Sequence, residues 1–221
     1  MVKLTLERKE KEKEQRRNAI VDAAQELFFA KPYDEITIEA IAEKAQLAKG
    51  TVYLYFESKE DLHIAVALRG TKILNEMLKE KKGAGKNGLE KAFATGEAYY
   101  EFYKRYPQFF RLLIEAESKL ALSPDTLNIK ELADFASGNF REVLDAVVEG
   151  IKDGSVKPTL DPMLTAVFLI QSTRSMIRLP PGFEMFLKQA GADKDATLKF
   201  TLEALRQSLQ NTSDKKSEAS T

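Results

Sequence analysis

One stretch, residues 37–62, constrains the fold of this chain more than any other, and it reads TIEAIAEKAQLAKGTVYLYFESKEDL. Its first part predicts a helix, because Ile38 and Ile41 recur at the spacing that places side chains on one helix face. In its second part, Val52 and Phe56 stand four residues apart, which predicts a short helix with both side chains turned inward. The stretch therefore predicts two short helices joined by a tight turn.

The ends of these helices carry capping residues. Thr37 stands where an N-cap hydroxyl would accept a hydrogen bond from a free backbone N–H. Ser58 precedes Asp61 by three residues, which is the spacing of a capping box and predicts the start of a further helix. This order of elements is typical of the helix-turn-helix, whose second helix enters the major groove of DNA. The side chains left on the outer face of that helix are Lys49, Thr51, Tyr53, Leu54 and Tyr55.

Residues 16–70 resemble the DNA-binding domain of TetR-family transcriptional regulators. The matching run is KGTVYLYF, from Lys49 to Phe56, followed by SKEDL. Two positions depart from the family's usual turn. Gln46 replaces a common glycine where the turn requires positive φ, which is costlier for glutamine. Ala48 replaces a serine that usually caps the second helix, so about 1 kcal/mol of capping is missing.

The resemblance implies which side chains touch DNA. Base contacts are expected from the second helix, and Lys49 could donate to guanine while Leu54 could lie against a thymine methyl group. Phosphate contacts position the helix without reading sequence. For Tyr53 and Tyr55, the alternative is ordinary packing on the helix surface. The expected base contacts are Lys49, Gly50, Thr51, Leu54 and Tyr55, and the expected phosphate contacts are Arg17, Thr37, Tyr53 and Lys59.

Composition excludes several other classes of protein. The 221 residues contain 34 basic and 34 acidic side chains, which argues against non-specific coating of nucleic acid but permits local positive charge. Cysteine is absent and His63 is the single histidine, so thiolate metal sites and most nucleophile–base pairs are excluded. We expect no enzyme activity, no metal and no cofactor, and we interpret His63 as a packing residue. Apolar runs are too short to span a membrane, and we expect a cytoplasmic protein.

Helical periodicity continues to residue 210 and predicts an all-α fold of about nine helices. A three-helix DNA-binding domain (residues 16–62) is expected to precede a ligand-binding and dimerisation domain (residues 63–210). The charged N-terminal extension (residues 1–15) is interpreted mainly as a solvated helix start. Residues 211–221 are small and polar, which predicts a disordered tail.

Aromatic residues concentrate after residue 92, and successive positions such as Tyr99 and Tyr100 cannot face one core. One interpretation is a plain hydrophobic core. The other is an apolar ligand cavity, which the resemblance favours because it implies a C-terminal effector domain. The expected cavity residues are Phe93, Tyr99, Phe102, Tyr103, Phe110, Phe135, Phe140 and Phe168.

The resemblance also implies a homodimer in which the last two long helices pair with those of a second subunit. These residues could alternatively complete the core of one chain. The expected interface residues are Leu164, Val167, Phe168, Gln171, Leu198, Leu202 and Leu205.

The resemblance implies a ligand-responsive regulator, by default a repressor, that binds a palindromic operator as a dimer and is released by a small hydrophobic or aromatic effector. The alternative is a small-molecule sensor or interaction protein whose DNA-binding head is degenerate. Retention of Lys49, Thr51, Tyr53, Tyr55 and Lys59 argues against that alternative.

Overall fold

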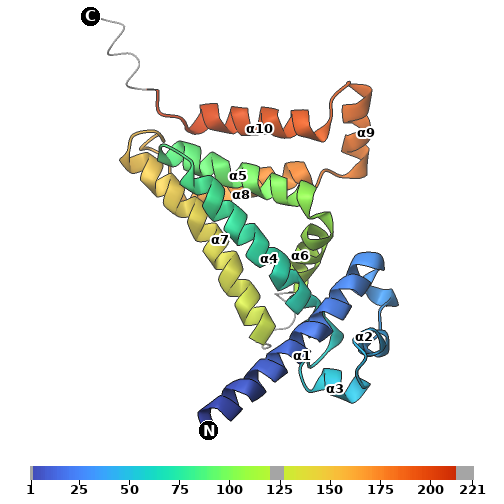
Figure 1. Ribbon diagram of the computed structural model, residues 1–221. Helices are drawn as coiled ribbons and strands as arrows, with labels where there is room; N and C mark the ends of the chain where they lie inside the picture. Colours follow the sequence, from blue (N-terminus) through green and yellow to red (C-terminus); the bar gives the residue numbers. More distant parts are fainter. Residues whose placement is uncertain (1, 120–126, 213–221) are drawn as a thin grey trace, which may run out of the picture. The chain divides into compact units, whose positions relative to one another are not determined.

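The structure is a computed structural model that describes residues 2–119 and 127–212 (Figure 1). Within these residues it contains ten α-helices and one 3-10 helix with no β-strand, so the predicted all-α fold is confirmed. The predicted disordered tail lies outside the described residues from position 213 onward. The elements are α1 (Val2–Ala30), η1 (Tyr33–Glu35), α2 (Ile38–Lys44), α3 (Lys49–Tyr53), α4 (Lys59–Gly83), α5 (Gly88–Arg105), α6 (Pro107–Lys119), α7 (Leu127–Lys152), α8 (Pro162–Ile177), α9 (Pro181–Gln189) and α10 (Lys194–Leu209).

The helices form two compact units. Unit 1 takes the described residues up to Lys72 together with Tyr106–Asp134, and unit 2 takes Ile73–Arg105 together with the described residues from Phe135 onward. The helices α4 and α7 each contribute to both units. This division differs from the sequence-based boundary at residue 62, which separates segments by expected function and stays a prediction.

Unit 1 is built around apolar side chains of α1, α3, α4 and the segment between α3 and α4. Ile20, Phe28, Val52, Phe56 and Leu62 are each no more than 1% exposed. His63 is buried in the same unit, and its ring packs edge-on against the ring of Phe28. Its Nε2 lies 3.0 Å from a carboxylate oxygen of Glu115 in α6. The histidine therefore serves packing in unit 1.

Unit 2 has its own core, in which α8 packs against both α5 and α10 (Figure 1). The apolar residues of this core include Phe93, Val147, Leu169 and Leu205. The helices α5 and α7 cross closely at two glycines, because a Cβ atom on Gly88 would lie 1.9 Å from the backbone nitrogen of Gly150. Residues with side chains would push these helices apart.

One helix, α9, differs from the expectation drawn from the sequence. The proline pair Pro180–Pro181 predicts a loop, yet Pro181 occupies the first turn of α9, where its missing N–H costs nothing. α1 is a single helix of 29 residues, so the charged N-terminal extension continues the first helix of the DNA-binding domain without a break.

Asn211, expected in the tail, donates its backbone N–H to the Ser155 carbonyl at 3.1 Å.

Candidate nucleic-acid interface

The short helix α3 is held by its inner face and leaves its outer face open. Val52 is fully buried and Phe56, just beyond the helix, is 1% exposed. On the outer side, Leu54 is 81% exposed and Tyr53 is 48% exposed. Such exposure of large apolar side chains favours a surface that meets a partner. Of the other expected base-contact residues, Lys49 and Gly50 are exposed, and Thr51 and Tyr55 are half-buried.

The turn before α3 has the geometry that the sequence predicted. Thr37 caps α2, and its hydroxyl accepts a hydrogen bond from the Ala40 backbone N–H at 3.1 Å. Gln46 has a φ of 56°, in the left-handed region that glycine adopts at lower cost. Ala48 is the N-cap of α3 and supplies no side-chain acceptor. Packing of Val52 and Phe56 therefore does more to hold the recognition helix than its capping does.

Lys49, the first residue of α3, forms an ion pair with Glu39 of α2. Its ammonium also lies 5.8 Å from the centre of the Tyr53 ring. The hydrogen bond from Lys49 is the main cause that lowers the pKa of the Glu39 carboxyl. Both side chains are more than half exposed, so water screens the pair and DNA phosphates can compete for the lysine.

Lys59, an expected phosphate contact, links the start of α4 to the segment between α1 and α2. Its ammonium donates to the backbone carbonyls of Tyr33 and Ile36, each at 3.0 Å, and lies 4.0 Å from the centre of the Tyr33 ring. An ammonium has three donors, so one remains for a phosphate. The Tyr33 hydroxyl donates to Glu60, and its pKa is raised, mainly by burial and next by this hydrogen bond.

Arg17 is likewise held by protein groups. Its guanidinium donates to the side-chain oxygen of Asn128 at 2.9 Å and lies 5.0 Å from the centre of the Phe56 ring. Asn128 is buried at the start of α7 and donates in turn to an Asp61 carboxylate oxygen at 2.7 Å. This three-residue chain, which we call the Asn128 bridge, joins α1, α4 and α7 within unit 1. The sequence did not reveal it because its members are 44 to 111 positions apart.

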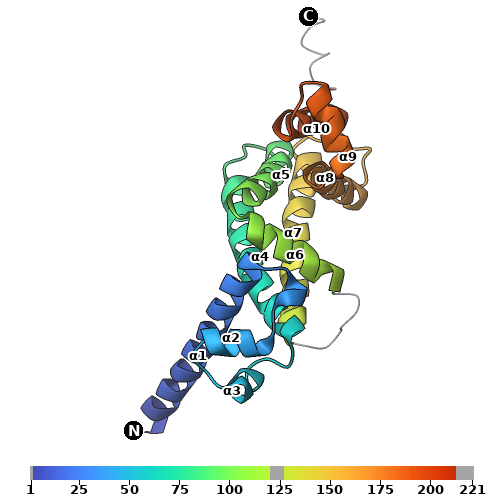
Figure 2. The same cartoon turned by 90° about the vertical axis from the view of Figure 1, so that its right-hand side faces the viewer.

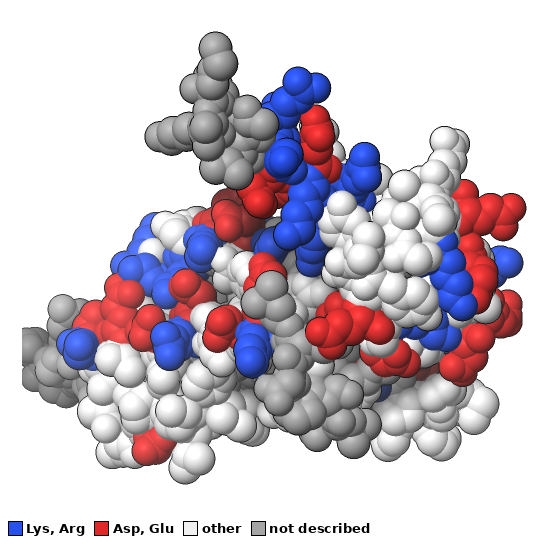
Figure 3. Space-filling view, turned by 90° about the horizontal axis from the view of Figure 1, so that it is seen from below, with Lys and Arg blue, Asp and Glu red and all other residues white. Residues whose placement is uncertain are grey.

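The charge on the face of the protein that Figure 3 shows is mixed. Seen from below the view of Figure 1, basic and acidic side chains are interspersed among the described residues (Figure 3). This agrees with the balanced composition of 34 basic and 34 acidic residues. Positive charge for a nucleic acid must therefore come from local groups.

The residues expected to line a ligand cavity are distributed over both units. Phe110 belongs to unit 1, and the other seven belong to unit 2. In unit 2, Phe93 is part of the hydrophobic core and Phe140 packs against it. Arg174 donates to the Tyr99 hydroxyl at 3.1 Å. The exposure of the expected cavity residues varies widely: Phe102 is fully buried, Phe168 is 52% exposed, and Tyr99, Tyr103 and Phe135 are half-buried. These exposures do not define one enclosed space, and the ligand cavity stays a prediction.

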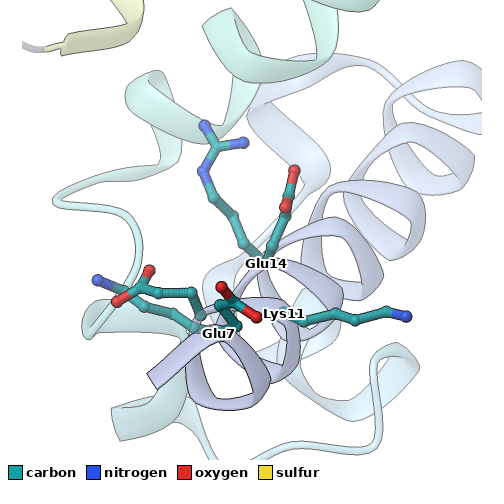
Figure 4. Close-up of a pocket in the computed structure, with 6 residues that line it drawn as sticks. Glu7, Lys11 and Glu14 are labelled. Atoms are coloured by element: carbon teal, nitrogen blue, oxygen red, sulfur yellow. The ribbon is translucent and has the colours of Figure 1, made fainter. Parts of the chain in front are cut away.

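One hollow in the structure lies on α1 and has a different character. Charged side chains line it, with Glu7, Lys11 and Glu14 along the helix (Figure 4). It is open to solvent and contains no aromatic residue, so it does not correspond to the expected effector cavity.

The residues expected at the dimer interface divide into two groups. Leu198 and Leu205 are buried within unit 2, where Leu202 also packs against the core, because these three share the inner face of α10. Leu164, Val167, Phe168 and Gln171 are exposed on the outer face of α8. Unit 2 has further exposed apolar residues that the sequence did not predict, namely Met163, Phe183, Met185, Phe186 and Phe200.

Two other kinds of site are absent among the described residues. No helix there is long and apolar enough to cross a membrane, and no group of three His, Cys, Asp or Glu side chains could hold a metal ion.

Residues 20–66 match the family described as "Bacterial regulatory proteins, tetR family". This match runs from Ile20 in α1 through α2 and α3 to Val66 in α4. The chain belongs to the TetR family of transcriptional regulators. Members of this family regulate transcription and are not enzymes, and the same holds for this regulator.

Relatives extend the similarity beyond the DNA-binding helices of the regulator. The Fatty acid metabolism regulator protein of Bacillus subtilis is 29% identical over 70% of this chain and 77% of its own length. The HTH-type transcriptional repressor DhaR of a Mycobacterium species is 23% identical over 90% of this chain and 96% of its own. The crystal structure of FadR from Bacillus subtilis in complex with stearoyl-CoA matches with a TM-score of 0.62 at 22% identity, covering 85% of this chain and 96% of that one, which supports the fold.

Proposed function

We propose that this TetR-family regulator is a repressor that binds a palindromic operator as a homodimer and is released by a hydrophobic effector. The observation that carries the proposal is α3, a helix anchored by Val52 and Phe56 that presents Lys49, Tyr53 and Leu54 outward. A recognition helix in the major groove reads bases through such outward side chains. Repression is supported by the name of the relative DhaR. Since genomic DNA is the target, we propose a cytoplasmic location.

The operator can be identified by selection from a random-sequence duplex pool with the purified protein. The selected duplexes should share a palindrome whose half-site centres are about one helical turn or a multiple apart. A Tyr53→Ala variant should keep its circular dichroism spectrum and lose affinity for the selected duplex. Because the Tyr53 side chain is 48% exposed, its truncation should leave the fold intact. A selection that returns no common sequence would overturn the proposal.

We assign the dimer contact to the outer face of α8, whose exposed Leu164, Val167 and Phe168 form an apolar stripe at helical spacing. A stripe of this kind on a soluble chain favours a partner surface. Replacing Leu164 and Phe168 together by Glu should convert the dimer to a monomer in sedimentation experiments. The matched control is a double Glu substitution at Phe183 and Phe186, which are equally exposed but lie on α9. Equal dissociation by both variants would refute the assignment.

The effector class is supported by aromatic residues in unit 2, by a relative named for fatty acid metabolism and by a similar solved structure in complex with stearoyl-CoA, both from Bacillus subtilis. We therefore expect a long-chain acyl-CoA, tested first as stearoyl-CoA, to lower DNA affinity. A ligand shifts such an equilibrium only if it binds the DNA-free state more tightly. Half-buried Tyr103 is the better test position in the expected cavity, because truncating fully buried Phe102 would also destabilise the core. If Tyr103→Ala leaves the response to stearoyl-CoA unchanged, Tyr103 does not belong to the effector site.

One observation favours the second candidate, a sensor with a degenerate DNA-binding head. The three cationic side chains expected at DNA are all held by protein groups: Lys49 by Glu39, Lys59 by two carbonyls and Arg17 by Asn128. If this candidate were correct, wild-type protein and the Tyr53→Ala variant would bind duplex DNA with the same weak affinity.

A further inference from the structure

Lys49, Lys59 and Arg17 are each bonded to protein groups. Other cationic side chains must therefore help to neutralise the DNA phosphates. Protein–DNA affinity rests largely on Lys and Arg side chains that replace counterions along the backbone. Because the net charge of the chain is zero, the required cations must form a local cluster. The N-terminal part of α1, which precedes the matched family segment at residues 20–66, contains such a cluster.

The register of α1 sorts its charges onto different faces. Lys9, Lys13 and Arg16 follow each other at spacings of four and three residues, so they share one face, and all three are exposed. We call these three residues the basic ridge. Within the described part of the chain, none of the three is held in an ion pair. The acidic residues Glu7, Glu10 and Glu14 also follow a helical spacing, but on another face of the same helix. Glu12 lies beside the ridge, three residues after Lys9 and four before Arg16, and is paired with Arg8.

The basic ridge is aligned with the side of α1 that packs into unit 1. Ile20 and Ala23 continue the same series at spacings of four and three residues, and both are buried. Since α1 is one continuous helix, the ridge points toward the side on which the rest of the DNA-binding helices lie. The N-terminal half of α1 reaches the end of unit 1 at which α3 is found, in both Figure 1 and Figure 2.

We propose that the basic ridge is a second DNA-contacting surface, which binds phosphates of the duplex whose bases α3 reads. A duplex engaged by α3 extends beyond it in both directions, and its strands carry a phosphate every ~3.4 Å of axis. Lys9 and Lys13 are about 6 Å apart along the helix, so the two ammonium groups can reach different phosphates. This contact carries no sequence information and supplies affinity beyond that of the engaged Lys49, Lys59 and Arg17.

The proposal rests on DNA binding by the regulator and is tested by salt dependence. Affinity for the selected duplex is measured by fluorescence anisotropy across a potassium chloride series, with full-length wild-type protein and a Lys9→Gln/Lys13→Gln variant. The slope of log affinity against log salt should fall by about one unit for each lysine lost, hence about four for a dimer. Glutamine keeps the helix, because its helix propensity is close to that of lysine.

The chain supplies a control on other faces of the same helix. An Arg8→Gln/Lys11→Gln variant also removes two positive charges, at positions that lie next to or between the ridge residues in the sequence. It loses the exposed Arg8–Glu12 ion pair, which contributes little to stability. This control should keep the wild-type slope, and a Lys9→Arg/Lys13→Arg variant should keep it as well. The proposal is overturned if the Lys9→Gln/Lys13→Gln variant has the same salt slope as wild type. It is also overturned if this variant and the Arg8→Gln/Lys11→Gln control lose the same amount of slope. If wild-type protein bound no selected duplex, the proposed function itself would fail, and the ridge with it.

Discussion

The N-cap of α3 allows a quantitative prediction about the recognition helix. Ala48 has the extended backbone of an N-cap residue, with φ −69° and ψ 144°, but no side-chain acceptor. A serine there can place its hydroxyl against the backbone N–H of Gly50 or Thr51, as Thr37 does for Ala40 in the preceding helix. We expect Ala48→Ser to stabilise α3 by about 1 kcal/mol. For a chain of this size that corresponds to a rise in melting temperature of about 2–4 °C.

Hydrogen exchange of the α3 amides measures this stabilisation locally, because α3 has only five residues and opens more readily than the core. A gain of about 1 kcal/mol should slow exchange roughly fivefold. The control is an isosteric pair, Ala48→Thr and Ala48→Val, of which only threonine carries the accepting hydroxyl. Equal exchange rates in these two variants would refute the capping argument, since side-chain shape alone would then account for any change.

Three further predictions concern packing and charge. Gly88→Ala should lower the free energy of unfolding by more than about 1 kcal/mol, because its Cβ would overlap the backbone of α7. Gly138 has open space around it, so Gly138→Ala should raise the free energy of unfolding by about 0.5 kcal/mol. Thermal unfolding measures both changes. Glu39→Gln should strengthen DNA binding several-fold at low salt by releasing Lys49, and unchanged anisotropy titrations would contradict this. Asn128→Ala should destabilise the protein by about 1–3 kcal/mol, measured by urea unfolding, because the buried Asp61 carboxylate loses the Asn128 donor and keeps the Glu57 backbone N–H at 3.3 Å.

Local patterns in the sequence were sufficient for the helix-turn-helix. The side-chain spacing in α2 and α3, the cap at Thr37 and the positive φ at Gln46 all depend on neighbours within a few positions, and the structure confirms each. Asp161 caps α8 through a similar short-range contact, in which its side chain accepts from the Leu164 N–H at 2.8 Å. Short-range hydrogen bonds and helical periodicity can be seen along the chain.

Contacts between distant segments could not be predicted in this way. The cations of Lys59 and Arg17 match the family pattern, but only the tertiary structure brings them to backbone carbonyls and to Asn128. In α10, periodicity identified Leu198 and Leu205 as one apolar face, and an apolar face can pack on its own chain or on another. The structure turns this face inward, against the core of unit 2.

The sequence by itself determined that this regulator is helical, where its recognition helix lies and which side chains that helix turns outward, because these properties follow from spacing along a single helix. Only the tertiary structure decided which cations are engaged by protein groups, which apolar faces remain exposed, and that α1 continues unbroken so that the basic ridge aligns with its buried face. These outcomes depend on which segments meet in space, and spacing along the chain carries no information about that.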